Sequence, residues 1–344
     1  MKNDKFERYS RQIFFPRIGL NGQEKLAKSR VAIVGAGALG TVIANHLTRS
    51  GVGFIRIIDR DFVEQSNLQR QMLYDENDAL ESKPKAIAAY EKLVQINSSI
   101  EIEPVVTDIH AWNAEELLSD VNLIVDGTDN FLTRYVINDV SIKYNIPWIH
   151  GGAVRSLGMF AVFTPEHGPC YRCLFPTPPQ GQTETCDMVG VISPVTHIVG
   201  SFEATEALKI LVEDHKNRNT NLEQYELWYN DEMKMDISHS KNAKCPACAD
   251  KNFEFLKASI HGDNYAALCG RNAVQVSPLE ERKIDLEKMK QRLAKIGSVE
   301  LTPFLLKCHL DHITLILFKN GRVMIQGTDD ITKAKSLYAK YIGS

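Results

Sequence analysis

Three glycines are spaced in the pattern Gly35-x-Gly37-x-x-Gly40, between an apolar run and a segment with helical periodicity. Such a turn lets the backbone come close to a phosphate, whose charge is favoured at a helix N-terminus. Asp59, nineteen residues after Gly40, ends the next predicted strand and can accept hydrogen bonds from ribose hydroxyls. The pattern favours an adenine nucleotide over glycines that merely allow close helix packing, but it does not separate NAD from ATP.

A polar run follows Asp59, where a dehydrogenase normally continues its sheet. It contains Asn67 and Arg70, and Lys83 lies thirteen residues after Arg70. Arg70 and Lys83 can supply two positive charges to a polyphosphate, and Asn67 can position an oxygen, whereas a hydride-transfer site needs none of these. Each cation alone is explained as well by a surface ion pair, so the prediction of a polyphosphate site depends on the whole set.

Carboxylates follow another predicted strand, at residues 123–125, in the sequence Asp126-Gly-Thr-Asp129-Asn130. The carboxyl ends of parallel strands meet at one edge of a sheet, so these groups are expected near the glycine turn. Carboxylates there suit a magnesium ion that is bound to phosphate. The alternative for Asp129 is a helix N-cap.

Four of the seven cysteines form two Cys-x-x-Cys pairs, Cys170 with Cys173 and Cys245 with Cys248, separated by 71 residues. Each pair can present both sulfurs to one tetrahedral metal, and together they predict a closed four-thiolate zinc site. All four positions are then taken, so the zinc is structural. The alternatives are a redox-active pair and four unrelated buried thiols.

Cys186 lies in a polar segment that we interpret as a mobile loop over residues 176–187. A thiol there is accessible, and the N-terminus of the apolar helix predicted at residues 195–211 can lower its pKa. Cys269 and Cys308 are predicted to be buried thiols with no chemical role.

Strand and helix patterns alternate along the first half of the chain. Strands are predicted at residues 30–34, 54–58, 102–106, 123–126 and 148–151, with helices at 41–49, 85–95, 113–118 and 132–144. This predicts an α/β fold, a Rossmann-like, mostly parallel sheet with helices on both faces. Residues 223–235 have strand character.

The composition changes near residue 255. We predict one domain at residues 1–250 and a small α+β domain at 255–344. In the latter, helices are predicted at 281–295 and 330–341, and Asn320-Gly321 joins strands 314–318 and 322–326 in a hairpin.

The 344 residues carry a formal net charge of −3 and are 44% hydrophobic. These values exclude a disordered or collagen-like chain and argue against a broad nucleic-acid-binding surface. The most apolar stretch, residues 31–44, is broken by glycines and is too short to span a bilayer. With no signal peptide at the N-terminus, we predict a cytoplasmic protein without nucleic-acid or membrane partners.

Taken together, these motifs resemble the adenylyltransferases that activate sulfur-carrier proteins, the MoeB and ThiF family, which are relatives of the ubiquitin-activating enzymes. The resemblance covers roughly residues 5–250. Its motifs are Arg8-Tyr-Ser-Arg11-Gln-Ile, Gly-Ala-Gly-Ala-Leu-Gly from Gly35, Ser-Asn-Leu-Gln-Arg-Gln from Ser66, Asp-Gly-Thr-Asp-Asn from Asp126, and Cys-Pro-Ala-Cys from Cys245.

The resemblance implies that ATP and magnesium bind to the motif residues and that the partner is a ubiquitin-like sulfur carrier. Arg11 resembles an arginine that reaches the active site of the other subunit, which implies a homodimer. The expected nucleotide-site residues are Gly35, Gly37, Gly40, Asp59, Asp61, Ser66, Asn67, Leu68, Gln69, Arg70, Lys83, Asp129 and Asn130. The expected catalytic residues are Arg11, Arg70, Lys83, Asp129 and Cys186, the last resembling a cysteine that links to the carrier in some relatives.

The implied reaction is attack of a carrier's C-terminal glycine carboxylate on the α-phosphorus of ATP, with release of pyrophosphate. The motifs do not separate a molybdopterin-synthase small subunit from a thiazole-pathway carrier, and we favour the former. A NAD-dependent oxidoreductase and a non-catalytic scaffold for a carrier remain as rivals. The tail from residue 255 does not fit a rhodanese domain, and the sequence assigns it no role.

Overall fold

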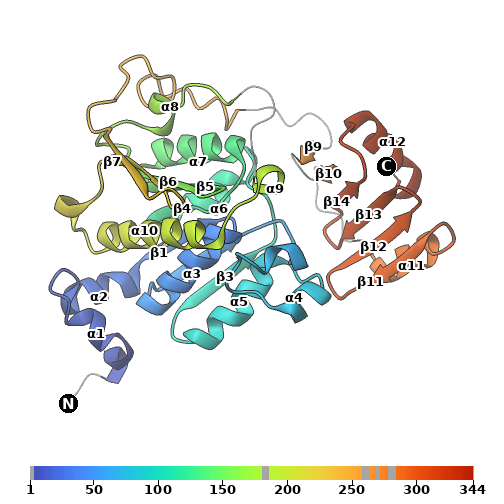
Figure 1. Cartoon of the computed structure of the whole chain (residues 1–344), viewed down its shortest axis with the longest axis horizontal. Helices are drawn as coiled ribbons and strands as arrows, with labels where there is room; N and C mark the ends of the chain where they lie inside the picture. Colours follow the sequence, from blue (N-terminus) through green and yellow to red (C-terminus); the bar gives the residue numbers. More distant parts are fainter. Residues whose placement is uncertain (1–3, 180–185, 258–263, 269–271, 278–283, 344) are drawn as a thin grey trace. The chain divides into compact units, whose positions relative to one another are not determined.

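The computed structural model describes residues 4–179, 186–257, 264–268, 272–277 and 284–343 (Figure 1). Two compact units are formed, one by residues 1–79 and 84–258, the other by residues 80–83 and 259–344. The four residues Leu80–Lys83 thus group with the C-terminal unit, although their neighbours in the chain belong to the N-terminal unit.

The N-terminal unit contains an eight-stranded sheet in the order β3-β2-β1-β4-β5-β6-β7-β8. Its first five strands are parallel, and β6, β7 and β8 extend it in antiparallel fashion. The strands are β1 (Arg30–Val34), β2 (Phe54–Ile58), β3 (Glu101–Val105), β4 (Leu123–Asp126), β5 (Trp148–Val154), β6 (Leu157–Phe163), β7 (Asn221–Glu226) and β8 (Asp231–Asp236). The predicted α/β class, with a mostly parallel sheet, is confirmed.

Helices cover both faces of this sheet. On one face lie α3 (Ala38–Ser50), α5 (Lys85–Ile96) and α10 (Ser193–Leu211), while α6 (Ala114–Leu118) and α7 (Phe131–Tyr144) lie on the other (Figure 1). Alternate residues of β1 serve the two cores: Ile33 packs with the first set of helices and Ala32 with the second. The central strands are buried on both faces, so they appear in the sequence as continuous apolar runs.

Two local predictions were wrong. Residues 223–235 form a hairpin of β7 and β8, and its turn was concealed because Trp228 and Tyr229 are large aromatic residues, while Asn230 takes a positive φ of 56°. Residues 180–185 of the predicted loop lie outside the described residues, but its end is helical, since α9 spans Cys186–Val189. The other short helices are η1 (Asp4–Tyr9), α1 (Ser10–Ile13), α2 (Gly19–Lys28), η2 (Gln65–Asn67), α4 (Glu76–Leu80), α8 (Tyr171–Leu174) and η3 (His215–Asn217).

The C-terminal unit contains a six-stranded antiparallel sheet in the order β11-β12-β13-β14-β10-β9. Its elements are β9 (Asn264–Leu268), β10 (Ala273–Ser277), α11 (Leu286–Leu293), β11 (Ser298–Leu301), β12 (Leu305–Leu310), β13 (Ile313–Phe318), β14 (Val323–Gln326) and α12 (Ile331–Tyr341). The predicted hairpin joins β13 to β14. Both helices pack on one face of the sheet.

Within the described part of the chain, no helix is both long enough and apolar enough to cross a membrane.

Candidate functional site

The nucleotide-site motifs meet at the ends of three adjacent strands. Val34, the last residue of β1, pairs with Ile58 of β2 on one side and with Asp126 of β4 on the other. The glycine turn, Asp59 and Gly127 therefore follow one another along a single edge of the sheet. From β1 the sheet grows through β2 in one direction and through β4 in the other, and such a switch point is where open α/β sheets bind ligands.

The glycines of the turn have different reasons to be glycine. Gly35 has a positive φ of 94°, and a Cβ there would lie 2.6 Å from the carbonyl oxygen of Gly127. A Cβ on Gly40 would overlap the carbonyl oxygen of Gly35. At these two positions glycine is needed for close packing of the backbone, which is the alternative that the sequence left open.

Gly37 is the glycine that faces open space. Apart from its neighbours in the chain, the one described atom within 4 Å of a Cβ placed on Gly37 is the Nε2 atom of Gln71, at 3.9 Å. Gly37 is also the N-cap of α3, so the first backbone N–H groups of that helix begin here. The structure therefore leaves room for a phosphate beside Gly37.

Gln71 is a residue of this edge that the sequence prediction left out. Its side chain is buried, and its Oε1 atom has no hydrogen-bond partner within the part of the chain that is described. A buried polar atom without a partner is rare in native proteins and points to a missing ligand or water. Its place beside Gly37 fits a bound nucleotide. Gln71 is the last residue of the motif Ser-Asn-Leu-Gln-Arg-Gln, and this was the signal that could have found it.

Asp59 holds the glycine turn from the end of β2. Its two carboxylate oxygens accept hydrogen bonds from the backbone N–H of Ala36, at 2.7 Å, and of Asp61, at 2.6 Å. Burial raises the pKa of Asp59, while Lys85 and the two N–H donors oppose that shift. Asp59 thus orders the turn and still has lone pairs for a ribose.

Asp61 forms ion pairs with Arg60 and Lys85, at 3.6 and 3.5 Å. Its backbone oxygen also accepts a hydrogen bond from the N–H of Lys85, at 2.8 Å. Asp61 therefore joins the segment after β2 to the start of α5.

Residues 64–70 form a short turn around η2. The Asn67 Oδ1 atom accepts a hydrogen bond from the backbone N–H of Glu64 and so caps this turn. The Arg70 guanidinium donates to the carbonyl oxygen of Ser66 at 2.8 Å. Of the remaining predicted residues, Gln69 is exposed and Leu68 packs against the core.

Lys83 belongs to the C-terminal unit. Its side chain is largely buried and forms an ion pair with Glu81 at 3.3 Å. Lys83 and Arg70 are therefore carried by different units of the structure.

Asp126, the last residue of β4, and Asp129, in the loop after it, differ in burial. Asp126 is fully buried; its Oδ1 atom accepts from Thr128, and its Oδ2 atom lies 2.9 Å from both Arg134 Nε and His150 Nδ1. Burial alone would raise the pKa of Asp126, but Arg134 and His150 lower it below its ordinary value. Asp126 is thus a structural carboxylate.

Asp129 is exposed and is not the helix cap that the sequence offered as an alternative. The N-cap of α7 is Asn130, whose Oδ1 atom accepts from the N–H of Leu132 at 2.9 Å. This capping bond occupies the oxygen of Asn130, which we expected at the nucleotide. Asp129 is therefore the carboxylate of this loop that is open to a cation.

Arg11 lies far from this edge in its own chain. Its neighbour Gln12 donates to the carbonyl oxygen of Ser50, and the ring of Tyr9 packs against Gly51. Both contacts are at the C-terminal end of α3, about 20 Å from Gly37 at the rise of an α-helix. Arg11 is exposed and lies beside the ring of Phe14, 5.9 Å from its centroid.

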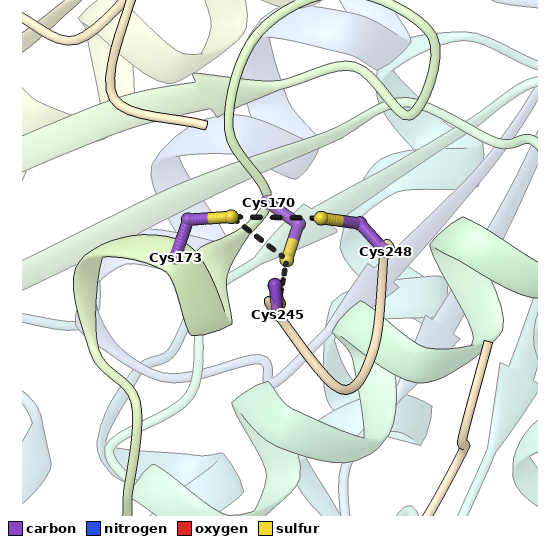
Figure 2. Close-up of side chains that lie close together, drawn as sticks. All are labelled: Cys170, Cys173, Cys245 and Cys248. Carbon is purple, nitrogen blue, oxygen red and sulfur yellow. Dashed lines mark hydrogen bonds between the residues drawn. The ribbon is translucent and has the colours of Figure 1, made fainter. Parts of the chain in front are cut away.

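The four cysteines of the two Cys-x-x-Cys pairs meet, as Figure 2 shows. Cys170 lies 3.8 Å from Cys173 and 3.6 Å from Cys245, and Cys173 lies 3.5 Å from Cys248, measured between sulfurs. These distances exclude disulfides, which join sulfurs at about 2.05 Å. The interpretation as four unrelated thiols is wrong.

This cluster fits a zinc ion. Four sulfurs at about 2.3 Å from a tetrahedral zinc lie about 3.8 Å apart, close to the observed spacing. The backbone N–H of Asn242 donates to Cys173 Sγ at 3.4 Å. The hydrogen bond with Cys170 and this N–H lower the pKa of Cys173, and the same hydrogen bond raises the pKa of Cys170. Ile142, Ala247 and Phe253 surround the cluster.

The remaining cysteines are less informative. Cys308 is buried in the core of the C-terminal unit, as predicted. Cys186 is the first residue of α9, but its side chain is outside the described part of the structure. Cys269 lies outside the described residues.

Comparison with known proteins decides the family. The family model described as "ThiF family" matches residues 9–247. The chain belongs to the ThiF family. The resemblance stated from the sequence motifs is thereby confirmed.

Relatives of this ThiF-family chain carry related names. It is 42% identical over 337 residues to the sulfur carrier protein ThiS adenylyltransferase of Bacillus subtilis, covering 98% of this chain and 99% of that protein. It is 41% identical over 213 residues to the adenylyltransferase and sulfurtransferase MOCS3 of Anopheles gambiae, covering 62% of this chain but 48% of that protein. The crystal structure of E. coli MccB with MccA-N7isoASN has the same fold, with a TM-score of 0.63, 22% identity and coverage of 72% and 76%.

Proposed function

We propose that this ThiF-family protein is an ATP-dependent adenylyltransferase that activates the C-terminal glycine carboxylate of a ubiquitin-like sulfur carrier. The observation that carries the proposal is the polar edge after β1, β2 and β4. It has an open helix N-terminus at Gly37 and a buried Gln71 oxygen that has no partner among the described residues. The end-to-end similarity to an adenylyltransferase of a sulfur carrier supplies the substrate class. We assign this activity to residues 1–250, which include Lys83.

The reaction needs placement and charge more than it needs acid or base catalysis. A carrier carboxylate oxygen forms a bond to the α-phosphorus, and the bond from that phosphorus to the bridging oxygen breaks, which releases pyrophosphate. The carboxylate is already ionised near pH 7, so no general base is required. Arg70 and Lys83 would neutralise charge on the phosphates, and the N-terminus of α3 at Gly37 would contribute its partial positive charge.

Asp129 is proposed to hold the magnesium ion that accompanies ATP. It is exposed at the strand edge, while Asp126 is occupied by Thr128, Arg134 and His150. A single carboxylate with phosphate oxygens and waters is a typical magnesium environment. Bound there, the ion would supply positive charge to the phosphates.

Arg11 is proposed to act in the nucleotide site of a second copy. Its anchoring at the C-terminal end of α3 keeps it from the glycine turn of its own chain. Beside it, Phe14 and Phe15 are 71% and 56% exposed, which is unusual for aromatic side chains and fits a surface that a second subunit covers. We therefore propose a homodimer.

The proposed carrier is of the ThiS type. The B. subtilis ThiS adenylyltransferase and this chain match over nearly their whole lengths, whereas MOCS3 is about twice as long as the part that matches. The molybdopterin-synthase small subunit, which the motifs alone led us to favour, is the alternative. Cys186 has no assigned part in adenylation, because acyl-adenylate formation needs no enzyme nucleophile.

The four-cysteine cluster is proposed to bind zinc in a purely structural role, because four thiolates leave no position for a catalytic water. We further propose that the protein acts in the cytoplasm, where such thiols stay reduced.

Exchange of labelled pyrophosphate into ATP tests the proposed function. The wild-type protein should catalyse exchange with a ThiS-type carrier and lose it when the carrier lacks its terminal glycine. Exchange with a molybdopterin-type carrier alone would change the substrate, and no exchange with either carrier would refute the activity.

The NAD-dependent alternative is tested separately. Thermal stability should rise with ATP and magnesium and not with NAD. Stabilisation by NAD alone would favour an oxidoreductase instead.

A further inference from the structure

Tyr74 is a buried residue of the N-terminal unit to which the proposed reaction gives no part. It lies between η2 and α4 and is 8% exposed. Its hydroxyl group donates a hydrogen bond to the backbone carbonyl oxygen of Ala36, at 2.7 Å. The carbonyl oxygen of Lys85 lies 3.2 Å from the same hydroxyl. Tyr74 therefore links the glycine turn after β1 to the first residue of α5.

A closed ring of hydrogen bonds passes through this hydroxyl. The N–H of Ala36 donates to one carboxylate oxygen of Asp59, at 2.7 Å, and the N–H of Asp61 donates to the other, at 2.6 Å. The N–H of Lys85 donates to the carbonyl oxygen of Asp61, at 2.8 Å, and the hydroxyl of Tyr74 completes the ring. Ala36 is thus held on both sides, at its N–H by Asp59 and at its carbonyl by Tyr74.

The carbonyl of Ala36 belongs to the same peptide group as the N–H of Gly37. This peptide bond is trans, so the group is planar and the carbonyl and the N–H point in opposite directions. A hydrogen bond that fixes the carbonyl of Ala36 therefore also fixes the direction of the Gly37 N–H. Gly37 is the N-cap of α3, at the position where the turn has room for a phosphate.

The hydroxyl of Tyr74 serves this hydrogen bond rather than the packing of the core. The aromatic ring is part of the apolar core on the α3 face of the sheet, where a phenylalanine ring would pack equally well. Burial and the nearby carboxylates of Asp59, Asp78 and Asp61 raise the pKa of Tyr74 well above its ordinary value. The hydroxyl consequently keeps its proton and remains a donor at any pH at which the protein works.

We propose that Tyr74 is a positioning residue for the phosphates of ATP. Through the carbonyl of Ala36 it directs the N–H of Gly37 towards a phosphate oxygen, so that this donor is oriented before the nucleotide binds. This role rests on the proposed function, because it concerns the same nucleotide site. Tyr74 acts on the phosphates alone, since the ribose is assigned to Asp59.

The test compares Y74F with Y90F in the full-length protein. Tyr90 is a half-buried tyrosine of α5 that packs against the same core, so the control also removes one hydroxyl. Calorimetry measures the Kd of ATP with magnesium and the Kd of adenosine, which has no phosphate. In Y74F the Kd of ATP should rise, and kcat/KM for ATP in the exchange reaction should fall, by about tenfold to a hundredfold, the loss that a displacement of about 1 Å produces. The Kd of adenosine and KM for the carrier should stay unchanged.

The two ligands separate a positioning role from a structural one. If Y74F binds ATP and adenosine with equal loss, or if its thermal midpoint falls while its affinity for ATP is unchanged, the positioning role is wrong. If Y74F does not fold, 4-aminophenylalanine at position 74 keeps the shape of the side chain and offers a weaker donor. That variant should lose affinity for ATP and not for adenosine, and wild-type affinity for ATP would overturn the proposal.

Failure of the proposed function gives a different result. A wild-type protein without exchange activity would refute the proposed function itself. An active wild type with an unaffected Y74F overturns the role of Tyr74 alone.

Discussion

Two polar regions of the N-terminal unit are built on opposite plans. At the strand edge, Asp129 is exposed, Gly37 faces open space, and Gln71 has a buried oxygen with no partner in the described chain. In the cysteine cluster, all four sulfurs lie within 4.8 Å of one another and are enclosed by apolar side chains. The edge has polar groups that are open to a ligand from solution, whereas the four sulfurs of the cluster surround one buried position.

The difference separates residues that bind a substrate from residues that hold the fold. A closed set of four ligands joins two distant segments and leaves nothing for a reactant. The exposed residues of an open edge contribute little to stability, so they can be changed without loss of the fold. Mutations in the two regions should therefore affect different measurements.

The largest effect is expected in the closed region. C245S should remove one thiolate, abolish zinc binding and lower the thermal midpoint by many degrees, since zinc binding to four such ligands contributes about 10 kcal/mol or more. Zinc content and thermal unfolding measure this, with C186S as the control cysteine. A C245S protein with full zinc content and unchanged stability would show that the cluster is not a metal site.

Two glycines of the same turn should give opposite results. G40A should fail to fold, or its free energy of unfolding should fall by about 2–5 kcal/mol, because its Cβ overlaps the carbonyl oxygen of Gly35. G37A should fold normally and lose affinity for ATP, because its methyl group occupies the space for a phosphate. Thermal unfolding and nucleotide binding are to be measured on both. Equal loss of stability in the two variants would contradict the distinction.

The exposed aspartate should matter for activity alone. D129A is expected to reduce pyrophosphate exchange by at least about a hundredfold, the loss typical of a deleted electrostatic contact. Its thermal midpoint should stay within about 1 °C of wild type, because surface changes contribute little to stability. D250A, another exposed aspartate, serves as the control. Pyrophosphate exchange at the wild-type rate in D129A would show that Asp129 is not part of the nucleotide site.

The smallest effect concerns pH and the closed region. Asp139 of α7 accepts a hydrogen bond from the backbone N–H of Phe255, just after the second cysteine pair, and burial raises the pKa of Asp139 to about 6. Because the folded pKa exceeds the unfolded value, this group stabilises the fold below about pH 4. That stability is lost as the pH rises through about 6.

D139N keeps an acceptor oxygen and does not titrate. The stability of wild type relative to D139N should therefore fall by about 2–3 kcal/mol between pH 4 and pH 7. Urea unfolding at several pH values measures this difference, and D250N controls for an exposed carboxylate. A constant difference across this range would mean that Asp139 stays ionised.

The central strands and the glycine turn were predictable because each is determined locally. The apolar runs at residues 30–34 and 54–58 and the spacing of Gly35, Gly37 and Gly40 depend on a few neighbouring positions. The cysteine pairing was predictable for a similar reason, since metal geometry prescribes the short spacing within each pair.

The rest depends on contacts that no local pattern encodes. The sequence does not show that the side-chain oxygens of Asn67 and Asn130 accept hydrogen bonds from nearby backbone N–H groups. It also does not show that Asp126 is hydrogen-bonded to Arg134 and His150. In the C-terminal unit, β12 was missed because both of its faces carry buried residues, which hides the alternation of a strand. The union of Leu80–Lys83 with the tail is a long-range contact of the same kind.

The spacing of the cysteine pairs also has a consequence for biosynthesis. Cys170 and Cys173 leave the ribosome 75 residues ahead of Cys245 and Cys248, respectively. At a translation rate of about 5–20 residues per second, the second pair is synthesised about 4–15 s after the first. During translation the nascent chain therefore carries two unmatched thiols, and this part of the fold is completed after the whole nucleotide-binding sheet has been synthesised.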